Sequence, residues 1–385
     1  RAMSERPARA NAAVLAGLDF GDDGCAESLE ELRLLAESAG LRPLASIQGK
    51  RQRPDPALYA GSGKVEEIGR AVREHNAVVV VFNHELSPAQ QRNLEKELEC
   101  AVLDRTGLIL GIFARRARSN EGKLQVELAQ LEYASTRLVR GWTHLERQRG
   151  GRGFLGGMGE TQIEVDRRLI GNRVKVLKEK LVQFKRRRDI QRRARVRGEV
   201  LSVSLVGYTN AGKSTLFNAL THAGSYTADQ LFATLDTTTR RLYLEAAGNV
   251  VLSDTVGFIR DLPHGLVAAF RATLEETIQA DLLLHLVDAS SSVREPQIAA
   301  VNAVLAEIGA DAIPQVLVWN KIDLTPVMPG LDRDEYGKIC RVSLSAKTGA
   351  GLGFLRVALT EVAATKKSAA INQDVEQHHR DTYVT

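Results

Sequence analysis

The 385-residue sequence lacks the features that mark several classes of protein. Its three cysteines, Cys25, Cys100 and Cys340, lie far apart, so neither a disulfide framework nor a zinc knuckle is indicated. The longest apolar run, residues 77–82, has the length of a strand and falls far short of the roughly 18 residues that span a bilayer. The N-terminus shows no charged stretch followed by an apolar signal segment. These absences exclude a membrane protein, and we expect a cytoplasmic one.

Aromatic residues are also scarce, at 5% of the chain, and the net charge is only +5. That average hides a basic segment: residues 101–200 contain 24 Lys and Arg against 11 Asp and Glu. Such segregation is typical of a protein that binds a polyanion, and with few aromatics the contacts would be to phosphates rather than by base stacking. A charged helix that is merely solvated would carry the same residues, so both interpretations stay open.

The length favours two or three domains, and the pattern predicts an α/β protein with four segments. Residues 1–118 alternate strand-like runs with amphipathic helices, which is typical of a small parallel α/β domain. Its predicted strands are residues 12–18, 43–47, 77–82 and 101–113. Residues 198–364 repeat the alternation, and the polar tail at 365–385 shows no periodicity, so we expect it to be frayed.

Residues 119–197 have a different period, which predicts a coiled-coil hairpin. Leucines at 124, 128, 131 and 138 mark a first arm, and apolar residues at 163, 170, 174, 177, 181 and 184 mark a second. Between the arms, six of the ten residues at 150–159 are glycine, so the chain can fold back there. The second arm ends in a basic run at 185–197 that faces either solvent or phosphate.

A phosphate-binding P-loop opens the 198–364 domain, after a predicted strand at 200–206 and before a helical pattern. Its glycines free backbone N–H groups for the phosphates, Lys213 would bridge β and γ, and Ser214 would bind Mg²⁺. The predicted nucleotide-binding residues here are Gly207, Tyr208, Thr209, Asn210, Ala211, Gly212, Lys213, Ser214 and Thr215.

Three further motifs follow in the order of a Ras-like GTPase. Asp254 ends an apolar strand and would hold Mg²⁺, while the Gly257 N–H would meet the γ-phosphate. The Asp323 carboxylate can accept two hydrogen bonds from guanine, a donor pair that adenine lacks. The motif residues on the base side are Asn320, Lys321 and Asp323, together with Ser345, Ala346 and Lys347. The set predicts Mg²⁺-dependent hydrolysis of GTP.

Two positions around the phosphates bear on the rate. A GTPase needs a mobile threonine that closes on Mg²⁺ and the γ-phosphate, and Thr234 is our choice, with Thr237, Thr238 and Thr239 as alternatives. Phe258 stands where many GTPases carry a water-orienting glutamine, so hydrolysis should be slow without help.

A second glycine-rich stretch, Gly61-Ser62-Gly63-Lys64, resembles a P-loop but fails on inspection. Leu58 stands where the first glycine is needed, and Val65 replaces the Mg²⁺-binding hydroxyl. A helix start or an RNA-contacting loop is the better interpretation.

The motifs together resemble the HflX family of ribosome-associated GTPases. The resemblance rests on residues 61–67, on the glycine loop with Gly159-Glu160-Thr161-Gln162, and on the segments 232–236 and 254–258. It implies binding at the large ribosomal subunit and its rRNA, splitting of stalled ribosomes, and a hydrophobic residue in place of the catalytic glutamine. Asn210 occupies the position at which some related GTPases hold K⁺ against the phosphates; bonding within the loop is the alternative.

Two other functions compete with a ribosome-splitting GTPase. One is an RNA-binding or ribosome-assembly module for which GTP only sets affinity, which Phe258 permits. The other is an ATP-driven RNA remodeller, which would need an intact ATP motif in residues 1–118 and finds none. We expect the protein to be a monomer.

Overall fold

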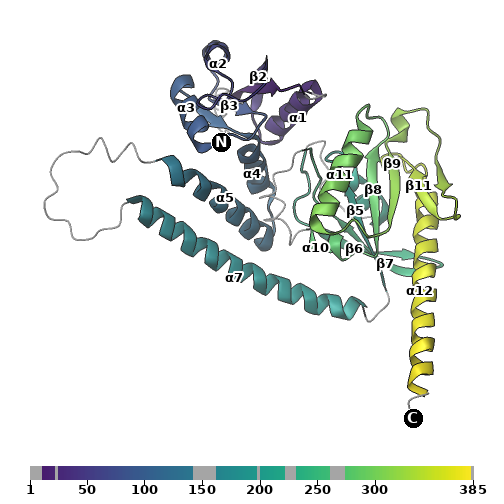
Figure 1. Ribbon diagram of the computed structural model, residues 1–385. Coiled ribbons are helices and arrows are strands. Elements are labelled where there is room, and N and C mark those ends of the chain that lie inside the picture. Colours follow the sequence, from purple (N-terminus) through teal and green to yellow (C-terminus); the bar gives the residue numbers. More distant parts are fainter. Residues whose placement is uncertain are drawn as a thin grey trace, which may run out of the picture. The chain divides into compact units, whose positions relative to one another are not determined.

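The computed structural model describes residues 11–21, 25–141, 162–196, 200–221, 231–260 and 274–382, and the chain divides into two compact units, Arg1–Leu181 and Val182–Thr385 (Figure 1). The glycine loop predicted at 150–159 lies outside the described residues, as do the side chains of residues 187–197 in the basic run.

The first unit contains the predicted small α/β domain, and this prediction is confirmed. Its parallel sheet has the strand order β2-β1-β3-β4. Strands β1 and β3 are buried along nearly their whole length, as expected for central strands covered by helices. The elements are β1 (Ala12–Asp19), α1 (Cys25–Ser38), β2 (Arg42–Lys50), α2 (Ser62–His75), β3 (Val79–Phe82), α3 (Pro88–Leu98), β4 (Ala101–Leu103) and α4 (Arg105–Arg116).

The strand predicted over residues 101–113 is wrong beyond its first three residues. β4 ends at Leu103, and α4 begins at Arg105. Asp104 causes the change, because its side chain accepts a hydrogen bond from the Gly107 N–H at 2.7 Å and caps the helix. The apolar residues that suggested a long strand instead line the buried face of α4.

The glycine-rich stretch at 61–64 forms the start of α2, so the helix interpretation is confirmed. Gly61 is the N-cap residue with φ 79°, a conformation that favours glycine. The Arg51 guanidinium donates to the Ala60 carbonyl at 2.7 Å, and the Lys64 ammonium donates to the Gln48 carbonyl at 2.8 Å. Both side chains therefore donate hydrogen bonds to backbone carbonyls of this domain.

Two long helices, α5 (Asn120–Gly141) and α7 (Gln162–Val196), form the predicted arms. Leu177 on the seam of α7 is fully buried, and Arg173 forms a salt bridge of 2.7 Å with Glu127 of α5. On its other side α5 is tied to the α/β domain, because the Tyr133 hydroxyl donates to the buried Asp104 carboxylate at 2.6 Å.

The second unit is built on a seven-stranded sheet with the order β10-β11-β9-β8-β5-β7-β6. Its five inner strands are parallel, whereas β6 and β10 pair antiparallel at the two edges and were not predicted. The elements are β5 (Leu201–Gly207), α8 (Lys213–Thr221), β6 (Thr238–Leu244), β7 (Gly248–Asp254), α10 (Glu275–Ile278), β8 (Leu282–Asp288), α11 (Arg294–Ile308), β9 (Gln315–Asn320), the short 3₁₀ helix η1 (Ile322–Leu324), β10 (Gly330–Arg333), β11 (Ile339–Ser343) and α12 (Leu352–Thr382). Because parallel strands end at one edge of the sheet, the motifs after β5, β7, β9 and β11 meet there.

The expectation of a frayed tail from residue 365 is wrong, since α12 continues to Thr382. Two lysines hold it to the sheet. Lys366 donates to the Asp281 carboxylate at 2.6 Å, and Lys367 donates to the Ala247 carbonyl at 2.7 Å.

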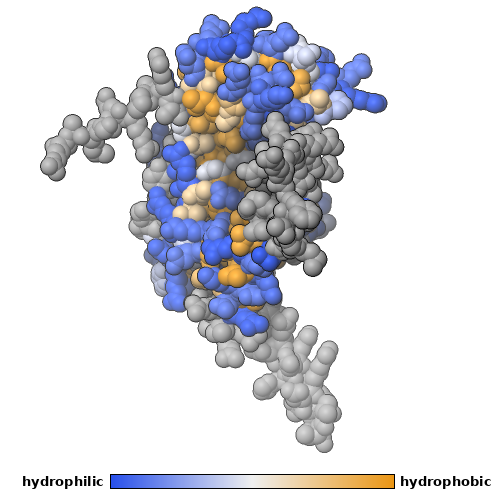
Figure 2. Space-filling model, turned by 90° about the vertical axis from the view of Figure 1, so that its left-hand side faces the viewer, coloured by the Kyte–Doolittle hydropathy of each residue, from blue (hydrophilic) through white to orange (hydrophobic). Residues whose placement is uncertain are grey.

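None of the helices in the described ranges is both long and apolar enough to cross a membrane. The face drawn in Figure 2 presents mostly hydrophilic residues around a smaller group of apolar ones.

Candidate functional site

The P-loop runs from the end of β5 to the start of α8, and two of its glycines adopt backbone conformations that exclude side chains. Gly207 has φ 147°, and an added Cβ would lie 2.4 Å from the Leu286 carbonyl oxygen. Gly212 has φ 94°, and its Cβ would lie 2.2 Å from the Asn320 amide nitrogen. The sequence needs glycine at both places for the loop to approach its neighbours.

Backbone hydrogen bonds fix this loop to the segment after β7. The Phe258 N–H donates to the Gly207 carbonyl at 3.1 Å, and the Thr209 N–H donates to the Phe258 carbonyl at 2.7 Å. Gly257 therefore lies against the P-loop, and an added Cβ there would come within 3.1 Å of the Lys213 ammonium. The two candidate γ-phosphate ligands, Lys213 and Gly257, are neighbours.

Lys213 is buried, with 6% of its surface exposed, and donates to the Gly207 and Tyr208 carbonyls at 3.0 and 2.8 Å. Burial lowers the pKa of the Lys213 ammonium to about 8, although the nearby Asp254 carboxylate opposes the shift. A bound polyphosphate would supply the negative charge that this buried ammonium lacks.

The three predicted metal ligands converge. The Ser214 hydroxyl donates to the Asp254 carboxylate at 2.7 Å and lies 2.7 Å from the Thr234 hydroxyl, which in turn donates to Asp254 at 3.1 Å. The second oxygen of Asp254 is buried and has no hydrogen-bond partner among the residues that the structure describes. Two hydroxyls and a carboxylate with a spare oxygen fit Mg²⁺, which prefers oxygen ligands.

The geometry separates Thr234 from two of the three alternative threonines, Thr238 and Thr239. Thr238 and Thr239 belong to β6, and the Thr239 hydroxyl lies 3.1 Å from the Ser253 hydroxyl within the sheet. Thr234 precedes that strand and reaches the Ser214 and Asp254 pair.

On the base side, Asn320 joins two motifs. Its amide nitrogen donates to the Ala211 carbonyl at 2.8 Å, and its amide oxygen accepts the Ala346 N–H at 2.9 Å. Asp323 is exposed, and its carboxylate accepts the hydroxyl of the buried Ser345 at 2.6 Å. The residues flanking this pair are Lys321, whose ammonium lies 2.7 Å from the Asp288 carboxylate, and the exposed Lys347.

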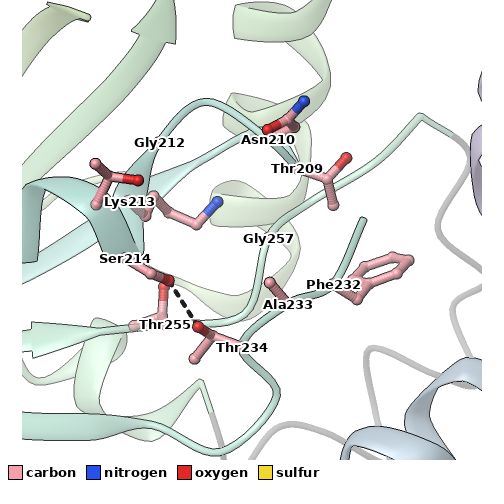
Figure 3. A pocket seen from close by; sticks show the side chains of 11 residues that line it. Thr209, Asn210, Gly212, Lys213, Ser214, Phe232, Ala233, Thr234, Thr255 and Gly257 are labelled. Carbon is pink, nitrogen blue, oxygen red and sulfur yellow. Dashed lines mark hydrogen bonds between the residues drawn. The ribbon is translucent and has the colours of Figure 1, made fainter. Parts of the chain in front are cut away.

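A pocket lies over the P-loop, and most of its lining was predicted (Figure 3). Phe232, Ala233 and Thr255 line it as well, although they were not predicted to bind the nucleotide. The lining residues are Thr209, Asn210, Gly212, Lys213, Ser214, Thr215, Phe232, Ala233, Thr234, Thr255 and Gly257. Tyr208 is not among them: its side-chain hydroxyl accepts the Arg260 N–H at 2.7 Å.

Two positions show where the site differs from a glutamine-dependent one. Phe258 is fully buried and is not among the residues that line the pocket, so its side chain is not placed to orient a water molecule there. Asn210 is exposed at the pocket and has φ 63°, a conformation that asparagine tolerates better than most residues.

Comparison with known proteins decides the family. Three family models match successive parts of the chain: GTP-binding GTPase N-terminal at residues 26–114, GTP-binding GTPase Middle Region at 116–195, and 50S ribosome-binding GTPase at 202–321. GTPase HflX of Escherichia coli (strain K12) is 56% identical over 360 residues, which cover 93% of this chain and 84% of that protein. The chain belongs to the HflX family of GTPases.

Two other HflX proteins match most of the chain at lower identity. GTPase HflX of Caldanaerobacter subterraneus is 48% identical, with 86% of this chain and 76% of that protein covered. GTPase HflX of Chlamydia pneumoniae is 41% identical, with 88% and 73% covered. Family membership and the P-loop domain make this chain an enzyme that hydrolyses GTP.

A solved structure shares the fold of this HflX-family chain. The crystal structure of the SsGBP and GDP complex has a TM-score of 0.51 and 24% sequence identity, and the match covers 92% of this chain and 99% of that one. At this identity the likeness supports the fold alone.

Proposed function

We propose that this HflX-family GTPase binds the large ribosomal subunit and splits or rescues stalled ribosomes, with GTP hydrolysis governing its release. The observation that carries the proposal is the match of residues 202–321 to a family model described as a 50S ribosome-binding GTPase. The basic segment at 101–200 supports it, because ribosomal RNA is the polyanion that such a charge excess suits.

The site geometry supports separate roles for three groups of residues, which would bind Mg²⁺, the phosphates and the guanine base. Ser214, Thr234 and Asp254 would hold Mg²⁺, which would neutralise charge on the β- and γ-phosphates. Lys213 and the Gly257 N–H would bind the β–γ end of GTP, as would the P-loop N–H groups. Asp323 would accept the guanine donors, and the loop at 345–347 would lie beside the base.

The proposal predicts that purified large subunits raise the rate of GTP hydrolysis roughly tenfold or more, because the buried Phe258 leaves the isolated protein without a glutamine. The measurement is phosphate release with and without subunits. Changing Arg192, Arg193 and Arg195 of α7 to Gln should lower the stimulated rate and its salt dependence while leaving the basal rate unchanged.

The matched control replaces three exposed basic residues outside α7, Arg240, Arg241 and Lys338, and should retain the stimulation. The alternative function, a GTP-switched RNA or assembly module with incidental hydrolysis, is also compatible with the buried Phe258. Subunits that bind without changing the rate would favour that alternative and contradict the proposal.

We also propose that Asn210 helps to hold a K⁺ ion against the phosphates, where the ion would offset charge that develops on the β–γ bridge. Basal hydrolysis should then be several-fold faster in K⁺ than in Na⁺ at equal ionic strength. Asn210→Ser should remove the difference and keep nucleotide affinity within a few-fold. The backbone at residue 210 has φ 63°, which glycine adopts without strain. Asn210→Gly therefore controls for backbone strain in the serine variant, because it loses the side chain without that strain. Equal rates in the two salts would eliminate the ion.

A further inference from the structure

One polar side chain that lines the nucleotide pocket, that of Thr209, has no role in the binding of Mg²⁺, phosphate or guanine proposed above. The Thr209 hydroxyl is buried and has no hydrogen-bond partner in the described part of the chain, and the residue as a whole is 6% exposed. The other threonine beside Gly257, Thr255, differs, since its hydroxyl donates to the Leu205 carbonyl at 2.5 Å. A buried hydroxyl without a partner destabilises the fold, so its presence at a ligand site calls for a ligand.

Thr209 is held against the γ-phosphate side of the pocket. Its Cα and its methyl carbon lie 2.9 and 2.8 Å from the place where a Cβ on Gly257 would stand, and its N–H bonds to the Phe258 carbonyl. Figure 3 shows Thr209 beside Gly257, across the pocket from Ser214. The Thr209 methyl group faces Gly257. Rotation of χ1 to another staggered conformation would bring the Thr209 hydroxyl to the position that the methyl group now occupies.

The same hydrogen bonds that place Thr209 turn Phe258 away. The Phe258 backbone pairs with Gly207 and Thr209, and its ring is fully buried outside the pocket lining. A water molecule that attacks the γ-phosphate therefore finds no side chain from position 258. Among the described residues that line the pocket, Thr209 has a buried hydroxyl without a hydrogen-bond partner, and its backbone and methyl group lie against Gly257.

We propose that Thr209 is a positioning residue for hydrolysis, whose hydroxyl accepts a hydrogen bond from the attacking water. The water oxygen forms a bond to the γ-phosphorus, and the bond from that phosphorus to the β–γ bridging oxygen breaks. The bridging oxygen keeps the electron pair and leaves as GDP, and the proton of the water passes to the phosphate. Thr209 is unchanged at the end of the step.

The test compares Thr209→Val, which keeps the shape and removes the hydroxyl, with Thr209→Ser, which keeps the hydroxyl. The valine variant should lose roughly tenfold or more in basal kcat, while the Kd for GDP, which lacks the γ-phosphate, stays within about twofold of the parent. The serine variant should retain most of the activity. Because valine removes an unpaired buried hydroxyl, its Tm should equal or exceed that of the parent.

Three results would overturn the proposal: a valine variant as active as the parent, a serine variant as slow as valine, or equal losses of GDP and GTP affinity. If valine proves unstable, Thr209→Ala replaces it in the comparison with serine. The inference rests on the phosphate roles of Lys213 and Gly257 but not on ribosome binding. A Lys213 variant that is inactive beside an unaffected Thr209→Val would therefore refute the threonine role alone.

Discussion

Asp323→Asn is expected to weaken GTP binding by roughly 2 to 4 kcal/mol, about 30- to 1,000-fold in Kd, and to shift preference toward xanthosine triphosphate. The amide presents a donor to the donors of guanine, whereas xanthine offers an acceptor there. Asp323 is exposed and accepts the Ser345 hydroxyl at 2.6 Å, a bond that the amide oxygen retains. The loop should therefore keep its conformation, and the loss should be specific to the base.

Titration with GTP and xanthosine triphosphate measures this effect. Asp311→Asn, a charge-matched change at an exposed residue before β9, is the control and should bind GTP as the parent does. An Asp323→Asn protein with parental GTP affinity would mean that the guanine is read elsewhere.

Lys213→Ala and Ser214→Ala are each expected to reduce hydrolysis at least about hundredfold. Lys213 contributes a charge held 3.0 Å or less from the P-loop carbonyls, and Ser214 contributes a hydroxyl to the triad with Thr234 and Asp254. Lys213→Ala should leave the protein folded, because burial disfavours the charged ammonium and lowers its pKa.

Single-turnover hydrolysis and thermal melting measure both effects, and Lys338→Ala serves as a control at an exposed lysine outside the nucleotide site. Undiminished turnover in the Lys213 or Ser214 variant would place the chemistry outside this pocket. Loss of activity together with a collapsed Tm would show a folding defect instead.

The sequence predicted the second unit better than the first, and the reason is chemical. A nucleotide demands particular atoms at particular places, so Gly212, Lys213 and Asp323 can be recognised without knowledge of the packing. The apolar run at 101–113 contains no ligand-binding motif that would require particular residues at particular positions. Short apolar runs fit strands and buried helices alike, and the capping bond from Gly107 to Asp104 that decides between them is visible only in the structure.

The edge strands and the orientation of side chains around the pocket also could not be predicted from the sequence. β6 begins within the threonine-rich stretch that indicated a switch segment, and only its antiparallel pairing with β7 shows where that segment ends. Likewise, Phe258 was recognised as a replacement for glutamine. That its ring is buried and that Thr209 is left beside Gly257 depend on backbone bonds between residues 49 and 51 positions apart in the chain.

The Asn320 side chain, which holds the P-loop through Ala211 and the base loop through Ala346, makes the two halves of the nucleotide site thermodynamically linked. A ligand that orders one loop lowers the entropic cost of ordering the other, so the coupling free energy must be the same in both directions. Guanosine should thus tighten the binding of pyrophosphate by the factor by which pyrophosphate tightens guanosine. A triphosphate with the wrong base would be penalised twice, once at Asp323 and again through a less ordered phosphate loop.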